Sequence, residues 1–266
     1  MKVITSFNCL KQTTAKYMVV EELDISSPLG KMQVIDIVSD GLVLVAGPSS
    51  IMDVDKMITY LKQFHLDKIF IDGAFSRHSS TAISDGFIYC VGAGYSTILS
   101  NIINKTALDL SRFSLPEVSP QILKLKLDTN ISFITDENVV IKTEETSLLD
   151  FDFNQMIVPK NTAYLYLPNA LTDQYAKRLL LHKREIFYHI LLNHLSSLQI
   201  QDDTLKRMNR SNIKIYVKKQ IPLLAICMNP FSPYRDSYGV EEMKQELQAL
   251  TKVPVINVLE EGEQHE

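Results

Sequence analysis

The chain has 266 residues, of which 45% are hydrophobic and 22% are charged, as in an ordinary globular protein with a sizeable core. Its formal net charge of -4, with lysines and arginines scattered along the chain, gives no electrostatic basis for nucleic-acid binding. No apolar run approaches the roughly 20 residues that a membrane helix needs, so we expect neither nucleic acid nor membrane as a partner.

The beginning of the chain and its cysteines predict a cytoplasmic protein. The sequence does not open with a basic region and a long apolar run, as a signal peptide would. Cys9, Cys90 and Cys227 are odd in number and far apart, which is typical of reduced thiols.

Apolar runs that end in loops of small residues recur along the chain, and we interpret each as a strand. They are residues 41–50, 68–75, 86–96, 163–170 and 221–232, with a sixth run at 253–258. Continuous apolar character predicts strands covered on both faces, as in a parallel sheet between helices. We therefore expect three of these runs to contain buried strands, at residues 42–46, 69–71 and 87–91.

Helical periodicity fills the gaps between several of these runs. Apolar residues recur at spacings of three and four in residues 51–64, 96–113 and 240–251. Strands that alternate with helices predict an α/β fold, with a mostly parallel sheet and flanking helices.

The middle of the chain has a different pattern. Residues 121–142 contain short, partly alternating runs with a turn signal between the last two, which predicts a small antiparallel excursion. The acidic stretch 143–155 follows and is a candidate linker. We expect an α/β first half at 1–118, the excursion and linker at 119–160, and an α/β second half at 161–266, or else one continuous domain.

Ligands of parallel sheets bind where the carboxyl ends of neighbouring strands meet. If residues 41–48, 68–73 and 86–94 are neighbouring strands, their loops gather at one edge and form a rim for a ligand or partner. The predicted rim residues are Gly47, Pro48, Ser49, Asp72, Gly73, Arg77, Asp85, Gly92 and Gly94.

Within this rim, Asp72, Gly73 and Arg77 form the predicted functional centre. Gly73 permits a tight turn or a close backbone approach. Asp72 supplies a carboxylate, and Arg77 supplies a permanently charged fork for an anion. A structural alternative stays open, in which Asp-Gly is an ordinary turn, Arg77 pairs with Asp72 or Asp85, and a serine at 49–50 caps the next helix.

Two nucleotide-binding motifs are incomplete in this sequence. Gly92 and Gly94 follow a strand, but Thr97 stands where the third glycine of a dinucleotide fingerprint belongs. A Gly-Lys pair precedes Met32, where a phosphate loop needs Ser or Thr, and Ile25 stands at the place of its first glycine. We therefore do not expect the chain to hydrolyse ATP through such a loop.

The histidines and serines complete no catalytic motif. His182, His189 and His194 are separated by gaps of seven and five, and on a helix a gap of seven would place two rings roughly 10 Å apart, too far to share a metal. No Gly-x-Ser-x-Gly elbow is present. The sequence thus gives no catalytic residue and no metal ligand, which favours a protein that is not itself an enzyme.

Four segments taken in order resemble one known family. They are "SSPLGKMQVIDIVSDGLVLVAGPSS", "FIDGAFSRHSS", "ISDGFIYCVGAGYS" and "MNPFSPYRDSYG…VPVINV". Together they are similar to the reactivase subunit of the B12-dependent lysine 5,6-aminomutase, from about residue 5 to the end. The family pattern has threonine before Pro-Leu-Gly, whereas this chain has Ser27.

The resemblance implies an adaptor that acts in lysine degradation and amino acid fermentation. Such a chaperone-like subunit would help to replace damaged cobalamin on an adenosylcobalamin-dependent aminomutase, and would bind no cofactor tightly itself. Its implied partners are the mutase and a MutS-like ATPase subunit, which would supply the energy. Two alternatives stay open: a small-molecule or nucleotide-binding α/β enzyme that uses Asp72, Arg77 and Gly92–Gly94, and a regulator that senses an amino acid or cobalamin there.

An adaptor needs an exposed surface with aromatic and arginine side chains, because these residue types most often anchor interfaces. The proline-broken loop after residue 229 is the candidate, with Phe231, Tyr234, Arg235 and Tyr238. The alternative is that this loop folds back and buries its rings in its own domain.

Overall fold

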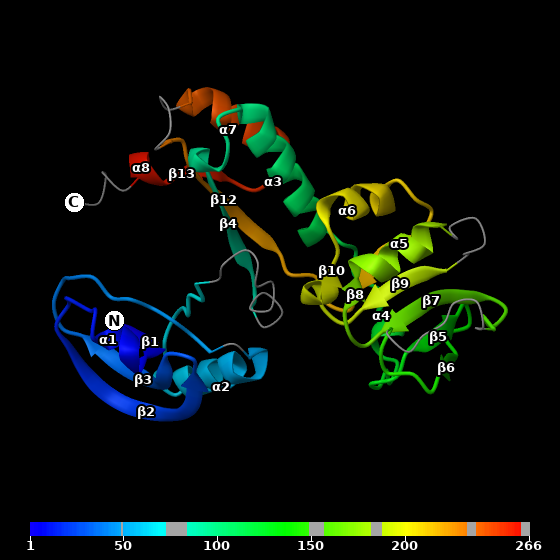
Figure 1. Ribbon diagram of the computed structural model, residues 1–266, viewed down its shortest axis with the longest axis horizontal. Coiled ribbons are helices and arrows are strands. Elements are labelled where there is room, and N and C mark those ends of the chain that lie inside the picture. The colour runs from blue at the N-terminus through cyan, green and yellow to red at the C-terminus, as the bar shows by residue number, and fades with distance from the viewer. Residues whose placement is uncertain (49, 73–83, 149–156, 182–187, 233–237, 262–266) are drawn as a thin grey trace. The chain divides into compact units, whose positions relative to one another are not determined.

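The computed structural model describes residues 1–48, 50–72, 84–148, 157–181, 188–232 and 238–261. The chain divides into two compact units, Met1–Ile83 and Ser84–Glu266 (Figure 1). This division differs from the boundaries expected at 118 and 160. The physical reason is that the helix after residue 98 packs against strands from the end of the chain, which places residues 84–118 with the second half.

The described part of the first unit contains an antiparallel sheet against which helices pack. Its elements are β1 (Lys2–Ser6), α1 (Phe7–Leu10), β2 (Tyr17–Ser27), β3 (Gly30–Ile37) and α2 (Ile51–Lys62), and the strand order is β1-β3-β2. A small core joins the sheet to α2, and its members are Ile4, Leu23, Ile25, Met32, Val34, Met57, Tyr60 and Leu61. The helix expected at 51–64 is confirmed, whereas the antiparallel sheet was not expected.

The Pro-Leu-Gly segment forms the tight turn between β2 and β3. Gly30 has φ +103°, a left-handed conformation that favours glycine. The Ser27 hydroxyl accepts a hydrogen bond from the Leu29 N–H at 3.0 Å and donates one to the Gly30 carbonyl at 3.1 Å. A threonine hydroxyl could make the same bonds. Serine in place of the family's threonine therefore keeps the chemistry of this turn.

The expected strand at 42–46 is wrong, because this segment forms no ladder. It lies along β1, where the side chain of Thr5 takes part in its hydrogen bonds. The Thr5 hydroxyl donates to the Leu44 carbonyl at 2.8 Å and accepts from the Ala46 N–H at 3.0 Å. Within the described residues of the first unit, the Leu42 side chain is 77% exposed, and those of Leu44 and Val45 are also exposed.

The expected strand at 69–71 is also wrong. No strand is assigned there, and the Phe70 side chain is 80% exposed. Among the described residues, no backbone hydrogen bond joins this segment to a neighbour. An apolar run becomes a strand only where a partner strand pairs with it, and no described strand of this unit pairs with residues 69–71.

The described part of the second unit is α/β and contains three sheets. Its elements are β4 (Phe87–Gly92), η2 (Ala93–Tyr95), α3 (Leu99–Phe113), α4 (Pro120–Leu123), β5 (Ser132–Thr135), β6 (Val140–Lys142), β7 (Thr162–Leu167), β8 (Leu171–Thr172), α5 (Asp173–Leu181), β9 (His189–Leu192), η3 (Leu195–Ser197), β10 (Leu198–Gln199), α6 (Asp202–Asn209), β11 (Ile215–Val217), β12 (Leu223–Asn229), α7 (Val240–Ala249), β13 (Val255–Asn257) and α8 (Val258–Glu261). No helix in the described ranges is long and apolar enough to cross a membrane.

One sheet of this unit is fully parallel and has the order β13-β12-β4. Helices α3 and α7 pack on one of its faces (Figure 1). The core between them includes Tyr89, Val91, Ile102, Phe113, Ile226, Met228, Met243, Leu247 and Val255. The strand expected at 87–91 is therefore confirmed, and so are the helices expected at 96–113 and 240–251.

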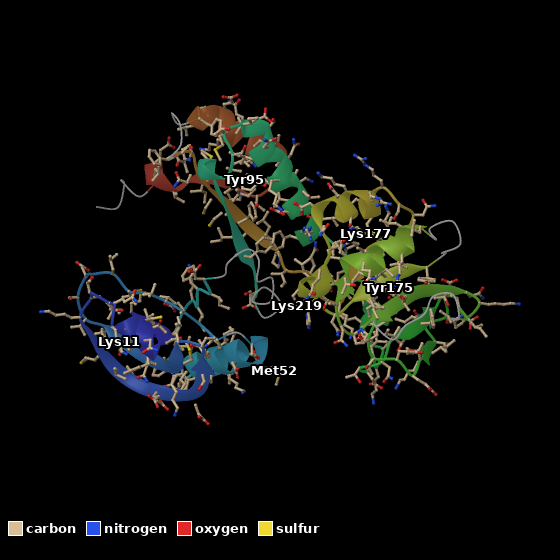
Figure 2. All side chains as sticks on the ribbon, in the orientation of Figure 1. Lys11, Met52, Tyr95, Tyr175, Lys177 and Lys219 are labelled. Atoms are coloured by element: carbon tan, nitrogen blue, oxygen red, sulfur yellow. The ribbon has the colours of Figure 1, made fainter. Side chains whose placement is uncertain are left out.

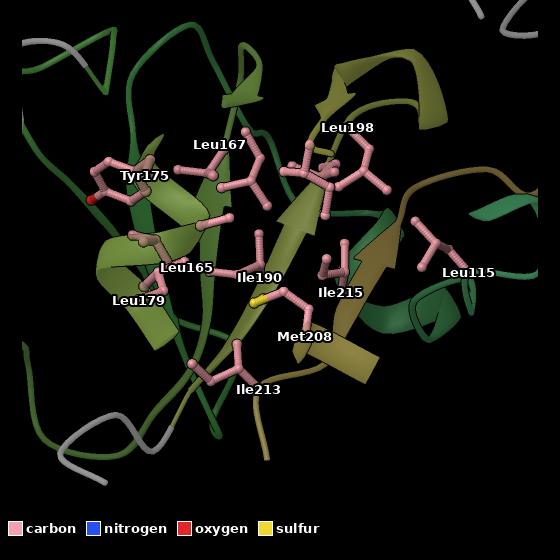
Figure 3. Close-up of a cluster of buried hydrophobic side chains, with 14 of the residues drawn as sticks. Leu115, Leu165, Leu167, Tyr175, Leu179, Ile190, Leu198, Met208, Ile213 and Ile215 are labelled. Carbon is pink, nitrogen blue, oxygen red and sulfur yellow. The ribbon is translucent and has the colours of Figure 1, made fainter. Parts of the chain in front are cut away.

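The largest sheet has five strands in the order β11-β9-β7-β5-β6. Strands β7, β9 and β11 are parallel, and β5 and β6 pair antiparallel, which confirms an antiparallel excursion within 121–142. Side chains of α5 and α6 meet those of β7, β9 and β11 in the main core (Figure 3). The labelled members include Leu165, Leu167, Tyr175, Leu179, Ile190, Met208 and Ile215.

A partly buried network of charges connects α3 to the beginning of α6. Arg112 donates a hydrogen bond to Asp202 at 2.7 Å and another to the Ile200 carbonyl at 2.9 Å. Lys105 donates to both Asp109 and Asp202, each at 2.9 Å. Burial alone would raise the pKa of Asp202, but the hydrogen bonds from Lys105 and Arg112 outweigh it and lower that pKa.

Candidate functional site

The parallel strands β4, β12 and β13 end together and form a first carboxyl edge, defined by Gly92, Asn229 and Asn257. Gly92 is the register partner of Asn229, and Met228 is the partner of Asn257. Among the described residues, a Cβ atom on Gly92 would meet only the Gly94 backbone, at 4.0 Å. Gly92 therefore lies at a carboxyl edge, but its neighbours there are Asn229 and Asn257 rather than the loops after 41–48 and 68–73.

The two asparagines of this edge redirect the chain as it leaves the sheet. Asn229 Oδ1 accepts a hydrogen bond from the Phe231 N–H at 2.9 Å, and Asn257 Oδ1 accepts one from the Leu259 N–H at 3.2 Å. Such side-chain turns take the place of further ladder bonds. The Asn-Pro-Phe segment of the family-like sequence thus begins at the same edge as the Gly-Ala-Gly loop.

The loop after Asn229 was expected either to be an exposed interface or to bury its rings in its own domain, and its residues differ in this respect. Phe231 is 59% exposed, as an interface residue would be. Tyr238 is buried, and its hydroxyl donates a hydrogen bond to the Ser96 carbonyl at 2.9 Å, which ties the end of the loop to the segment after η2. Tyr234 and Arg235 lie outside the described residues.

Other predicted rim residues lie elsewhere in the chain. Gly47 and Asp72 are exposed in the first unit, where Pro48 is buried. Asp85 precedes β4 and so lies at its amino end, not at the carboxyl edge with Gly92. Ser49, Gly73 and Arg77 lie outside the described residues. Ser50 occupies the N-cap position of α2, but its side chain makes no capping hydrogen bond.

A second carboxyl edge, which the sequence reasoning missed, lies at the ends of β7, β9 and β11. The last residues of these strands, Leu167, Leu192 and Val217, are paired in register. The next residue of each strand is Pro168, Asn193 and Lys218, and these three define the edge. The Lys218 N–H donates a hydrogen bond to the Leu192 carbonyl at 3.1 Å, which extends the ladder by one residue.

Polar side chains converge at this second carboxyl edge. The buried Tyr166 hydroxyl donates a hydrogen bond to Asn193 Oδ1 at 2.8 Å. The Asn193 amide donates to the Pro168 carbonyl at 2.9 Å, which fixes its orientation. Lys218 Nζ lies 4.5 Å from the centroid of the Tyr166 ring and donates to its hydroxyl at 3.3 Å.

Lys218 is a half-buried cation, and among the described residues no carboxylate forms an ion pair with it. Burial lowers the pKa of its amine. The same charge contributes to a lowered pKa of His194, where partial burial of the imidazole is the larger cause. A cation in this setting gains from a bound anion, because an opposite charge offsets the cost of burial.

The signal for this edge in the sequence was the apolar run at residues 189–192, which the sequence reasoning did not interpret as a strand. The histidines of this segment lie at a strand rather than on a helix, because His189 begins strand β9 and His194 follows it. His182 lies outside the described residues. Four consecutive residues at 189–192 suffice for a strand here because β7 and β11 pair with them on both sides.

Comparisons with known proteins identified no relative of this chain. No protein-family model, no curated protein and no solved structure matches the chain. Within the described ranges, no group of three or more His, Cys, Asp or Glu side chains is placed to hold a metal ion.

Proposed function

We propose that this chain is the adaptor subunit of a reactivation complex that exchanges damaged cobalamin on an adenosylcobalamin-dependent amino acid aminomutase. The proposal rests on the ordered resemblance of four segments to the reactivase family. Its partners would be that mutase and a MutS-like ATPase subunit, and it would act in the cytoplasm without a tightly bound cofactor of its own.

One structural observation supports this proposal: every family-like segment exposes a large apolar side chain. Leu42 belongs to the first segment, Phe70 to the second, Tyr95 to the third and Phe231 to the fourth, and all four are exposed (Tyr95 is labelled in Figure 2). Exposed apolar side chains that gather into patches are typical of sites where another protein binds. A partner that covers them would gain roughly 25 cal/mol for each Å² removed from water.

The mechanism that follows is a shift of equilibrium between two states of the mutase. Damaged cobalamin leaves only if the mutase opens, and an adaptor favours the open state only by binding it more tightly than the closed state. To move a 1:99 population to 99:1 requires about a 10⁴-fold difference in affinity, or about 5.5 kcal/mol. The apolar side chains of the family-like segments are the groups we expect to supply this difference.

The deciding experiment is reactivation of a cobalamin-inactivated aminomutase with ATP, intact cofactor and the ATPase subunit. Activity should return only when this chain is present. Leu42→Ser combined with Phe70→Ser should reduce the recovered activity, while the chain keeps its circular dichroism spectrum. Recovery that is equal with and without the chain would overturn the proposal.

The chain offers a matched control for these substitutions. Leu181 is 76% exposed, close to the 77% of Leu42, but it lies outside every family-like segment. Leu181→Ser should therefore leave reactivation unchanged. If Leu181→Ser is as damaging as Leu42→Ser, then loss of apolar surface in general, rather than a specific contact, causes the effect.

A second candidate function is small-molecule binding at the second carboxyl edge, which the convergence of Tyr166, Asn193 and Lys218 favours. A carboxylate or phosphate group is the ligand class that the Lys218 cation would bind. A thermal-shift screen of metabolite anions should then raise the unfolding temperature of the chain. Lys218→Met should abolish that rise, whereas Lys219→Met, at the exposed neighbour labelled in Figure 2, should not.

A further inference from the structure

Two of the three cysteines of this chain lie side by side on adjacent strands. Cys90 in β4 and Cys227 in β12 are register partners in a parallel ladder. Register partners point to the same face of a sheet, because side chains alternate along both strands in step. The two thiols are therefore neighbours, although they lie far apart in the sequence.

Both thiols point away from the helices of this sheet. Residues on either side of each cysteine are buried in the core that α3 and α7 cover, and these are Tyr89, Val91, Ile226 and Met228. Alternation then places Cys90 and Cys227 on the opposite face. Cys90 is exposed and Cys227 is partly exposed, whereas Cys9 is buried in the first unit.

The spacing of the two strands suits a covalent link. Neighbouring strands lie about 4.7–4.9 Å apart, and the Cα atoms of a disulfide are usually about 4.4–6.8 Å apart. Neither cysteine is part of a disulfide in this structure. The ladder holds the two Cα atoms at a strand-to-strand spacing that falls within this range.

We propose that Cys90 and Cys227 form a two-thiol modification site that reacts with small disulfides and closes to a cross-strand disulfide. The ligand class is a low-molecular-weight disulfide such as oxidised glutathione. This inference does not depend on the proposed adaptor function.

The reaction takes place in two exchange steps. The thiolate of one cysteine attacks a sulfur of the small disulfide, which forms a mixed disulfide and releases one small thiolate. The second cysteine's thiolate then attacks the protein sulfur of that mixed disulfide, and the second small thiolate leaves. Overall, the two protein thiols lose two electrons and two protons, and the small disulfide is reduced to two thiols.

The closed form has a physical consequence for the second unit. A disulfide between β4 and β12 closes a long loop of the unfolded chain and reduces its conformational entropy. The oxidised chain should therefore unfold at a higher temperature than the reduced chain. Excess dithiol reductant should restore the original unfolding temperature.

The test treats the reduced, full-length chain with oxidised glutathione and maps its cysteines by mass spectrometry. We expect loss of two hydrogens, a peptide link between Cys90 and Cys227, and an unmodified Cys9. The single variants Cys90→Ser and Cys227→Ser should instead accumulate a glutathione adduct, because no second thiol resolves it. Cys9→Ser should behave as the wild type, and circular dichroism should verify that each variant folds.

A dithiol-specific probe provides an independent measurement. Phenylarsine oxide condenses with two thiols and releases water, and it should bind one equivalent to the reduced chain and resist a monothiol wash. The single variants Cys90→Ala and Cys227→Ala should each lose that resistance, whereas Cys9→Ala should keep it. The proposal is overturned if the wild-type chain retains glutathione as the single variants do, or if the internal link includes Cys9.

Discussion

The two units of this chain use similar apolar sequence in different ways. In the second unit, the apolar runs that include β4, β7, β12 and β13 form strands, and helices pack against their sheets. In the first unit, the runs at 41–48 and 68–72 form no strand and expose Leu42 and Phe70. The difference teaches that a continuous apolar run shows a tendency to be buried. Whether the run forms a strand depends on other segments that can pair with it and pack against it.

The units also differ in how they use polar groups. The second unit buries charges where each has a partner, as Asp109 does with Lys105 and Tyr89. The first unit has a partly buried ion pair of Lys2 with Asp36, but its turns and segment ends use hydroxyl groups such as those of Thr5 and Ser27. We therefore expect the first unit to depend on backbone geometry and the second on paired charges.

The largest expected effect tests the backbone dependence of the first unit. Gly41 has φ +149°, and a Cβ atom there would lie 2.4 Å from the Ala15 N atom and 2.5 Å from its Cα. Gly41→Ala should cost roughly 3–5 kcal/mol, from strained φ and overpacking against backbone that cannot move aside. Hydrogen exchange with mass spectrometry should show lost protection in β1 and β3 and unchanged protection in the second unit.

The matched control for this change is Gly47→Ala. Nothing lies within 4 Å of a Cβ atom on Gly47, and its φ is not positive. Protection of both units should remain as in the wild type. Equal damage from the two alanines would mean that glycine at 41 has no special role.

The next effect tests the paired charges of the second unit. The carboxylate of Asp109 accepts hydrogen bonds from Lys105 and from the Tyr89 hydroxyl, each at 2.9 Å. Asp109→Ala leaves both donors with one fewer partner and should cost about 2–4 kcal/mol. Denaturant unfolding measures this loss. Asp53→Ala, which removes an exposed ion pair of α2 with Lys56, should change the free energy of unfolding by at most about 1 kcal/mol.

Acid should weaken the second unit through the carboxylates at the beginnings of its helices. The hydrogen bond from Lys177, helped by the Gln201 N–H, lowers the pKa of Asp173 to about 2 from its ordinary 3.8. A depressed folded-state pKa gives stability that is present above pH 4 and is lost as pH falls toward about 2. Bonds from Lys105 and Arg112 lower the pKa of Asp202 in the same sense.

Unfolding free energies measured between pH 6 and pH 2 check this prediction. Asp173→Asn should flatten the decline, because its amide does not titrate. Asp203→Asn serves as the control, since Asp203 is in the first turn of α6 and its side chain is 94% exposed. A decline that keeps its full slope in Asp173→Asn would contradict the assignment.

The smallest expected effect on stability tests the uncovered surface of the first unit. Leu42→Ser should change the free energy of unfolding by no more than about 0.5 kcal/mol, because the side chain is already in water. Its counterpart in the second unit is Leu165, which is fully buried, and Leu165→Ser should cost about 3 kcal/mol or more. A large loss with Leu42→Ser would show that residues 42–46 are covered in the folded chain.

The sequence by itself determined the alternation of strands and helices and several of the elements that make it. The apolar runs that contain β4 and β12 predicted strands, and three- and four-residue spacing predicted α2, α3 and α7. These signals are local, because periodicity and continuous apolar character depend only on nearby residues. The rule that strand ends meet did not identify the neighbour of Gly92, since the loops after 41–48 and 68–73 were expected there and Asn229 is its register partner.

Only the tertiary structure decided which strand ends meet and which apolar runs lie in a core. Strand order places Asn193 between Pro168 and Lys218, and pairing of β4 with β12 places Cys90 beside Cys227. Both arrangements depend on hydrogen bonds between residues far apart in sequence. A single run cannot encode its partner or its covering layer, which is why 42–46 has the pattern of a buried strand and lies exposed.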